Sequence, residues 1–163
     1  MPNNVAGRVA AHRNVELQSQ AGNQHFMFAM HCDKAPFDDV NVRLALKYGL
    51  DRQEMVDKIL FGYGELGNDH PIGSGQRFHN TELPQREYDP DRARFHLKEA
   101  GLDSVSVDLS VADAAFLGAI DAGVLYSEKA RAAGIDLNVN RVPNDGYWSS
   151  VWLNHPFCAV YWG

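Results

Sequence analysis

An acid and an imidazole stand next to each other in a glycine-rich stretch, where they could form part of a hydrolase site. Asp69 precedes His70, and Ser74 follows within IGSGQ. In serine hydrolases an aspartate orients a histidine, which in turn activates a serine. The G-x-S-x-G pattern that presents such a serine at a strand-to-helix turn is absent from the sequence. A small hydrolase using Asp69 and His70 is therefore the alternative function. The preferred interpretation is that Asn68 and Asp69 hold a loop through hydrogen bonds to its backbone.

Potential metal ligands occur together at residues 31–33, which read His-Cys-Asp. Neighbouring residues of an extended chain point to opposite faces, so only His31 and Asp33 would face the same way. The sequence has no H-E-x-x-H or C-x-x-C spacing. Its two cysteines, Cys32 and Cys158, fit neither a zinc site nor a disulfide framework. A single disulfide between them is left as an open alternative. We expect no metal site.

The stretch GYGELG, residues 62–67, has the G-x-G-x-x-G spacing of a dinucleotide site. That motif works where it leaves a strand and opens a helix, because the helix N-terminus then meets the pyrophosphate. Here it follows a predicted helix and enters a predicted loop. We read it as a helix end and a turn, and we expect no cofactor.

A further acidic pair, Asp38 and Asp39, precedes a leucine-rich run. Working carboxylate pairs converge on a substrate from separate elements, whereas acids at a helix start accept hydrogen bonds from its free N–H groups. We therefore predict that Asp39 begins a helix. Asp51, with Glu54 three residues later, has the spacing of a capping box at the start of a second helix. Asp89 followed by Pro90 indicates a third helix start.

Composition limits the classes of protein that fit. The chain has 163 residues, of which 45% are hydrophobic and 22% charged, with a net charge of −6. This is enough chain for one hydrophobic core. The acidic balance and scattered basic residues argue against nucleic acid as a partner. The sequence contains no apolar run long enough to span a bilayer, and its first 25 residues contain no apolar core of a secretory signal.

Alternating and helical patterns predict an α/β domain. Residues 14–20 and 25–31 resemble short strands around the turn at 21–24, and residues 63–87 resemble one long loop. The last third alternates between strands at 104–111, 135–142 and 157–162 and helices at 114–134 and 144–153. The run at 157–162 is typical of a strand covered on both faces, as in a parallel sheet. We expect residues 1–24 to be a lead-in with a first short strand, and residues 25–163 to form a single lobe.

Polar and aromatic residues follow the three later strands. They are Asp113 after the first, Asn144 after the second, and Tyr161 with Trp162 at the end of the third. Ligands of open α/β sheets bind beyond the carboxyl ends of the strands. These residues could form a recognition edge, with Asp113 meeting a donor group and the aromatic rings meeting apolar or cationic groups. Alternatively, Tyr161 and Trp162 belong to the core.

Three segments carry a family resemblance. The segment PFDDVNVRLALKYGLDRQEM has P-F-x-D-x-x-V-R-x-A-L followed by D-R-x-x-M, and YDPDRARFHLKEAG has Y-D-P-x-x-A-x-x-x-L-x-x-A-G. The segment LYSEKARAAGIDLNV resembles a helix-to-strand passage in the same family. Together they resemble the family 5 extracellular solute-binding proteins of ABC importers, the group that includes dipeptide, oligopeptide and nickel binders.

The resemblance implies a layered mixed sheet with flanking helices, as the second lobe of a two-lobed periplasmic-binding-protein fold. It also implies that the chain is a fragment truncated at its C-terminus, whose first lobe and signal peptide lie outside it. The complete protein would be periplasmic, or extracellular and lipid-anchored. It would enclose a peptide-like or other small polar solute between its lobes, deliver it to ABC permease subunits of the inner membrane, and perform no catalysis.

Two departures from the family pattern concern the solute. Peptide binders often carry a basic residue in the loop matching SVADAAF, where this chain has Asp113. Asp113 with Tyr161 and Trp162 would therefore favour a solute with an amine or another cationic group. The loop GNDHPIG resembles that of one branch of the family, and its Asp69 and His70 are included as candidate ligand-binding residues. The full candidate set is Asp113, Asn144, Tyr161, Trp162, Asp69 and His70.

Overall fold

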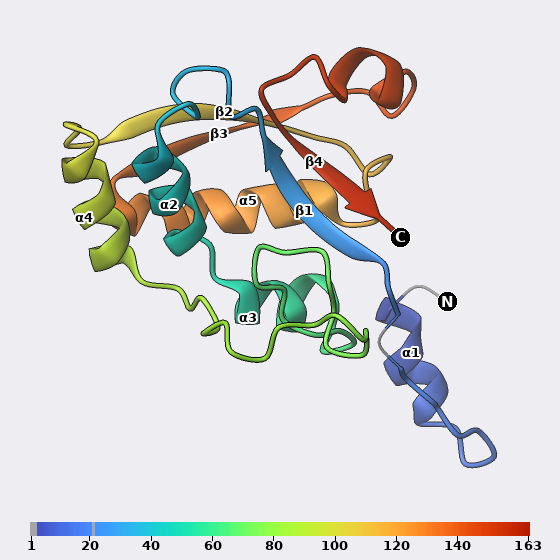
Figure 1. Ribbon diagram of the computed structural model, residues 1–163. Helices are drawn as coiled ribbons and strands as arrows, with labels where there is room; N and C mark the ends of the chain where they lie inside the picture. The colour runs from blue at the N-terminus through green and yellow to red at the C-terminus, as the bar shows by residue number, and fades with distance from the viewer. Residues whose placement is uncertain (1–2, 21) are drawn as a thin grey trace.

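A four-stranded mixed sheet organises the chain. The computed structural model describes residues 3–20 and 22–163 (Figure 1). The strands are β1 (His25–Met30), β2 (Val105–Val111), β3 (Ile135–Arg141) and β4 (Phe157–Trp162). Their order across the sheet is β1-β4-β2-β3, with β2 parallel to both β3 and β4 and with β1 antiparallel to β4. The carboxyl ends of β2, β3 and β4 therefore lie at the same edge.

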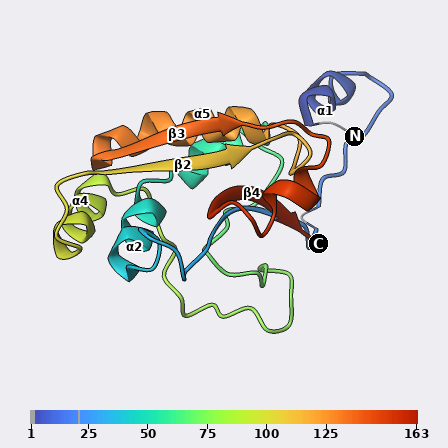
Figure 2. The same cartoon turned by 90° about the horizontal axis from the view of Figure 1, so that it is seen from above.

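Helices surround this sheet unevenly. Their bounds are α1 Asn3–Ala10, α2 Val40–Tyr48, α3 Arg52–Glu54, η1 Met55–Ile59, α4 Pro90–Glu99, α5 Ala119–Ala130, η2 Arg131–Ala133 and η3 Tyr147–Val151. Helix α5 runs along β2 and β3, while α2 packs against α4. Figures 1 and 2 both place α4 at one end of the sheet and the end of β4 at the other. Among the helices that the structure describes, none has the length and apolar character needed to cross a membrane.

The three predicted helix starts are confirmed. The Asp39 carboxylate accepts a hydrogen bond from the Asn41 backbone N–H at 2.7 Å, the Asp51 carboxylate from Glu54 at 3.0 Å, and the Asp89 carboxylate from Arg92 at 2.8 Å. These bonds satisfy N–H groups that the helices leave free at their first turns. Aspartate at a helix start is thus structural in this chain.

The Glu54 side chain makes other contacts than those of the capping box predicted at the start of α3. Its carboxylate pairs with the Lys129 ammonium at 2.7 Å and with Lys58 at 2.5 Å. Hydrogen bonds from these two lysines lower the pKa of the Glu54 carboxyl. The hydrogen bond to Glu54 in turn raises the pKa of Lys129. The Lys129 contact joins the end of α5 to α3, so Glu54 serves tertiary packing.

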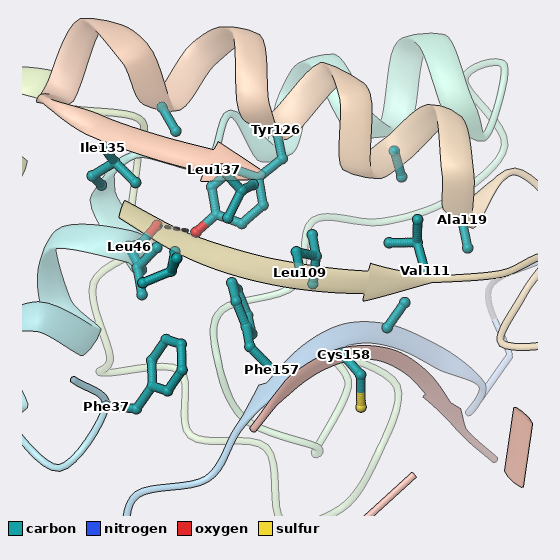
Figure 3. Close-up of a cluster of buried hydrophobic side chains, with 14 of the residues drawn as sticks. Phe37, Leu46, Leu109, Val111, Ala119, Tyr126, Ile135, Leu137, Phe157 and Cys158 are labelled. Atoms are coloured by element: carbon teal, nitrogen blue, oxygen red, sulfur yellow. Dashed lines mark hydrogen bonds between the residues drawn. The ribbon is translucent and has the colours of Figure 1, made fainter. Parts of the chain in front are cut away.

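The core lies between α5, α2 and the sheet (Figure 3). Leu109 and Val111 of β2 are fully buried beneath α5. Tyr126 of α5 is also buried, and its hydroxyl donates a hydrogen bond to the Leu46 carbonyl of α2 at 2.6 Å. Burial raises the pKa of Tyr126. Helix α5 lies so close to the sheet that a Cβ at Gly123 would come within 3.1 Å of Val111.

Some predicted elements differ from the structure at the N-terminal side. Residues 14–20 form no strand; Val15 is exposed there, and no neighbouring strand pairs with the segment's backbone groups. Residues 3–10, predicted as part of the lead-in, form α1, and Ala6 is buried. Residue 21 of the predicted turn lies outside the described residues. The boundary between residues 24 and 25 stays a prediction.

Other differences concern helix starts and the last strand. The helix predicted from residue 114 begins at Ala119, after Gly118, whose φ of +87° interrupts the helical path. The helix predicted from Asn144 or Asp145 begins after Gly146, without a side-chain cap. Strand β4 is buried from Phe157 to Val160, as predicted, but only one of its two neighbours is parallel.

Candidate functional site

Aromatic side chains gather where β4 ends. Tyr161 and Trp162 are 41% and 52% exposed, so the alternative that they belong to the core is wrong. The Tyr161 ring meets Trp148 edge to face with ring centres 5.4 Å apart, and Trp162 meets Trp152 at 6.0 Å. These two pairs of rings border an open hollow of about 380 Å³. Its lining residues are Trp148, Trp152, Val160, Tyr161, Trp162 and Gly163.

Tyr147 fixes the helical turn that carries Trp148. Tyr147 is 1% exposed, and its hydroxyl donates to the carbonyl oxygen of Ala159 at 2.7 Å and lies 3.3 Å from that of Ser110. Burial raises the pKa of Tyr147, which keeps the hydroxyl protonated as a donor. Because these carbonyls belong to β4 and β2, η3 is fastened to the sheet. Trp148 then projects from a rigid support and is 42% exposed.

Asp113 and Asn144 lie in the loops that follow β2 and β3. The Asn144 side-chain oxygen accepts a hydrogen bond from the Ala114 backbone N–H at 2.9 Å, which ties the two loops together. One Asp113 oxygen accepts from the Gly118 N–H at 3.2 Å, just before α5. Within residues 3–20 and 22–163, the other Asp113 oxygen has no hydrogen-bond donor from the protein. The loops that follow β2 and β3 are therefore joined through Asn144, and the role of this edge in recognition stays a prediction.

Asp69 and His70 do not form a catalytic dyad. The Asp69 carboxylate lies 2.7 Å from the guanidinium of the buried Arg52 and also pairs with Arg86. His70 instead lies near His79, with ring centres 5.6 Å apart. Ser74 Oγ donates to the Glu65 carboxylate at 2.5 Å rather than to an imidazole. This geometry argues against the hydrolase alternative.

The loop carrying these residues is closed at its base. The Asn68 side chain donates to the Pro84 carbonyl at 3.0 Å and accepts from the Arg86 N–H at 2.8 Å. Asn68 therefore holds the loop through backbone bonds, as predicted. Asp69 does so through the two arginine side chains, which the sequence did not reveal.

Side chains of the types that bind metals are dispersed across the described residues. Within residues 3–20 and 22–163, no three histidine, cysteine or acidic side chains gather in a way that could hold an ion. Cys32 is exposed and Cys158 is buried, and both are free thiols. Burial raises the pKa of Cys158 to about 11. A buried thiol of this kind behaves as a small apolar side chain.

Comparison with known protein families places this geometry in context. A model of the bacterial extracellular solute-binding proteins, family 5 (middle region), matches residues 2–163. The chain belongs to this family. Its mixed sheet with flanking helices is the fold of the periplasmic binding proteins, and the expected resemblance is confirmed.

Family 5 relatives with similar sequences are binding proteins for different solutes. Heme-binding protein A of Haemophilus influenzae is 34% identical over 87 residues, 53% of this chain and 16% of the relative. The dipeptide-binding protein of Escherichia coli is 29% identical over 103 residues, 63% of this chain and 19% of the relative. The chain thus spans less than a fifth of the length of these curated relatives. These relatives are binding proteins, not enzymes.

A solved structure has the same fold. The crystal structure of NikA from Staphylococcus aureus in complex with Ni(L-His)2 matches 99% of this chain and 34% of its own, with a TM-score of 0.80 and 16% identity. At this identity the match establishes the fold of the chain.

Two of the aromatic residues at the hollow are not among the predicted site residues. Trp148 and Trp152 lie within the helix predicted at 144–153. Their spacing was informative, because residues four apart lie on the same side of a helical turn. Phe26 and Phe116 do not line the hollow, but their rings stack at 4.4 Å between β1 and the loop after β2, a contact between distant segments that no local pattern predicts.

Proposed function

We propose that this chain is a solute-contacting lobe of the substrate-binding component of an ABC importer. The complete protein encloses a peptide-like or other small polar solute between two lobes. The observation that carries the proposal is the group of exposed aromatic side chains at the carboxyl end of β4, in a family 5 chain. Open α/β sheets bind ligands at the carboxyl ends of their strands.

The predicted site residues take distinct roles. Tyr161 and Trp162 contact the solute through their exposed rings. Asp113 offers its second carboxylate oxygen to an amine or another donor on the solute. Asn144 positions the loop that holds Asp113, since its oxygen is bonded to the Ala114 N–H.

The loop at residues 67–86 supplies a second candidate contact. Both Asp69 oxygens are engaged by arginines, so Asp69 acts as the anchor of this loop. His70 is partly buried beside His79. Of the two predicted residues Asp69 and His70, it is the His70 imidazole that remains for a solute contact. His70 is therefore a second candidate contact, in addition to the residues at the strand ends.

The remaining partners follow from the importer assignment. The first lobe of the same protein covers the solute from the other side, and hinge closure brings the lobes together. The loaded protein then docks on the permease subunits of the inner membrane. Its location is the periplasm, or the outer surface when a lipid anchors it.

Native mass spectrometry of the complete protein, purified without denaturation, tests this function. We expect a small molecule bound with one-to-one stoichiometry, which denaturation releases. Asp113→Ala should weaken binding of that molecule, whereas Asp108→Ala should not, because Asp108 is an exposed aspartate within β2 rather than at its end. The proposal would be contradicted if the complete protein carried no solute and if deletion of its gene left the import of every solute unchanged.

A further inference from the structure

The hollow at the end of β4 has a chemistry of its own. Four of its six lining residues are aromatic, namely Trp148, Trp152, Tyr161 and Trp162. None of the lining side chains is charged. We propose that this hollow is a subsite for a planar aromatic group of the transported solute. The inference rests on the proposed function and adds a solute class to it.

Ring geometry supports a planar occupant. Tyr161 stands at 81° to Trp148, and Trp162 stands at 74° to Trp152. Each perpendicular pair uses the edge of one ring and the face of the other, so further edges and faces remain unpaired. Aromatic rings favour offset-stacked or edge-to-face contacts, which a flat guest can make with both pairs.

The segments that carry the rings are fastened to the sheet by other side chains. Tyr147 ties η3 to the carbonyl of Ala159, and its side chain is buried. His155 Nδ1 lies 2.7 Å from the Ser110 hydroxyl, which fastens the segment between η3 and β4 to β2. The support of the hollow is thus independent of the exposed rings. A preorganised apolar surface binds a guest at a lower entropic cost.

Size and charge narrow the class of guest. A volume of about 380 Å³ lies near the lower end of the range for small-molecule pockets, roughly 300–1,000 Å³. The hollow therefore suits one ring system of a solute and not the whole of a larger one. Uncharged walls disfavour an ionised group inside, because its lost hydration would not be replaced. Asp113, in the loop after the neighbouring strand β2, is available for a cationic group of the same molecule.

Matched pairs of solutes test the subsite in the complete protein, freed of bound solute. The probes are tryptamine against hexylamine, and the dipeptide Ala-Trp against Ala-Leu, with affinity measured by calorimetry. Each pair keeps the amine and changes the aromatic group. We expect the aromatic member of at least one pair to bind about tenfold tighter, the size of one well-packed aromatic contact.

Variants assign the preference to the hollow. Trp148→Ala should reduce the preference for the aromatic member to about twofold or less, whereas Trp148→Phe should keep most of it because a ring remains. Phe95→Ala is the matched control, since Phe95 is an exposed aromatic residue of α4 at the other end of the sheet. A preference that survives Trp148→Ala, or that Phe95→Ala removes equally, overturns the inference.

The two proposals fail in distinguishable ways. Equal binding of aromatic and aliphatic probes, or binding of neither, overturns the aromatic subsite. If native mass spectrometry still finds a bound solute in that case, the importer function stands. Loss of thermal stability in Trp148→Ala without a change in probe preference also overturns the subsite, because Trp148 would then serve only its packing against Tyr147 and Tyr161.

Discussion

The carboxylate of Asp69 lies 2.7 Å from the guanidinium of Arg52, a residue 17 positions earlier in the chain. Arg52 is buried and also donates to the Lys47 carbonyl at 3.0 Å, so it joins the end of α2 to the loop at 67–86. Arg86 adds a second cation to Asp69. Burial, the largest single effect, lowers the pKa of Arg86, but the interactions with Tyr48 and with Asp69 together outweigh it and raise that pKa.

Removing Asp69 should therefore destabilise the protein. Asp69→Ala leaves two cations without their carboxylate, and we expect a loss of roughly 2–3 kcal/mol in the free energy of unfolding. Denaturant titration measures it. Asp33→Ala is the control, since Asp33 pairs with Lys34 on the surface, and it should change stability by less than about 0.5 kcal/mol. Equal effects of the two variants would contradict the structural role of Asp69.

The Tyr126 hydroxyl gives a second stability prediction. Tyr126→Phe removes a buried donor from the Leu46 carbonyl and should cost about 1–2 kcal/mol. Tyr161→Phe makes the same chemical change at an exposed ring and should be within about 0.5 kcal/mol of the parent. Chemical denaturation of both variants decides the matter. A Tyr126→Phe protein as stable as the parent would show that the hydrogen bond contributes nothing net.

Thiol reactivity should separate the two cysteines. Cys32 is exposed, whereas burial raises the pKa of Cys158 to about 11 and leaves little thiolate at neutral pH. Ellman's reagent should therefore modify one thiol of this chain quickly in the native state and the second only after denaturation. Cys32→Ser should abolish the fast phase. Rapid modification of Cys158 in the folded protein would contradict its burial.

His96 should make stability depend on pH. Burial, followed by the charge of Arg92, lowers the pKa of His96 below 6.5, against an opposing effect of Glu99. The unfolded chain then binds a proton more readily than the folded one as pH falls through 6.5, so folding free energy is lost on acidification. We expect the melting temperature to fall less in His96→Gln than in the parent between about pH 7.5 and 5.5. Parallel profiles for the two proteins would refute this assignment.

Local chemistry predicted much of the fold. Asp39, Asp51 and Asp89 identified three helix starts because capping depends on neighbouring residues. The strands β2, β3 and β4 were predicted by alternation or by a continuous apolar run. The segment at 14–20 also alternates, but a strand requires a partner, and pairing is a property of the whole fold.

The candidate site was only partly predictable for the same reason. Strand ends located Asp113, Asn144, Tyr161 and Trp162 because the topology of an α/β sheet fixes where they lie. The hollow needs Trp148, which η3 brings against Tyr161 through the buried bond of Tyr147 to the sheet. The pairing of Asp69 with Arg52 and Arg86 is likewise a contact between distant segments. His70 stands out as a partner of Asp69 because the two are adjacent in the sequence, whereas Arg52 and Arg86 are distant from Asp69 along the chain.

We propose that this lobe contacts a solute through the end of β4. Calorimetric titration of the complete protein with the solute identified by native mass spectrometry tests it most directly, comparing Trp162→Ala with Phe95→Ala. We expect a loss of affinity of about tenfold or more for Trp162→Ala, since an exposed ring at the strand end is removed, and no change for Phe95→Ala. Unchanged affinity in Trp162→Ala would mean that the solute does not bind at the end of β4.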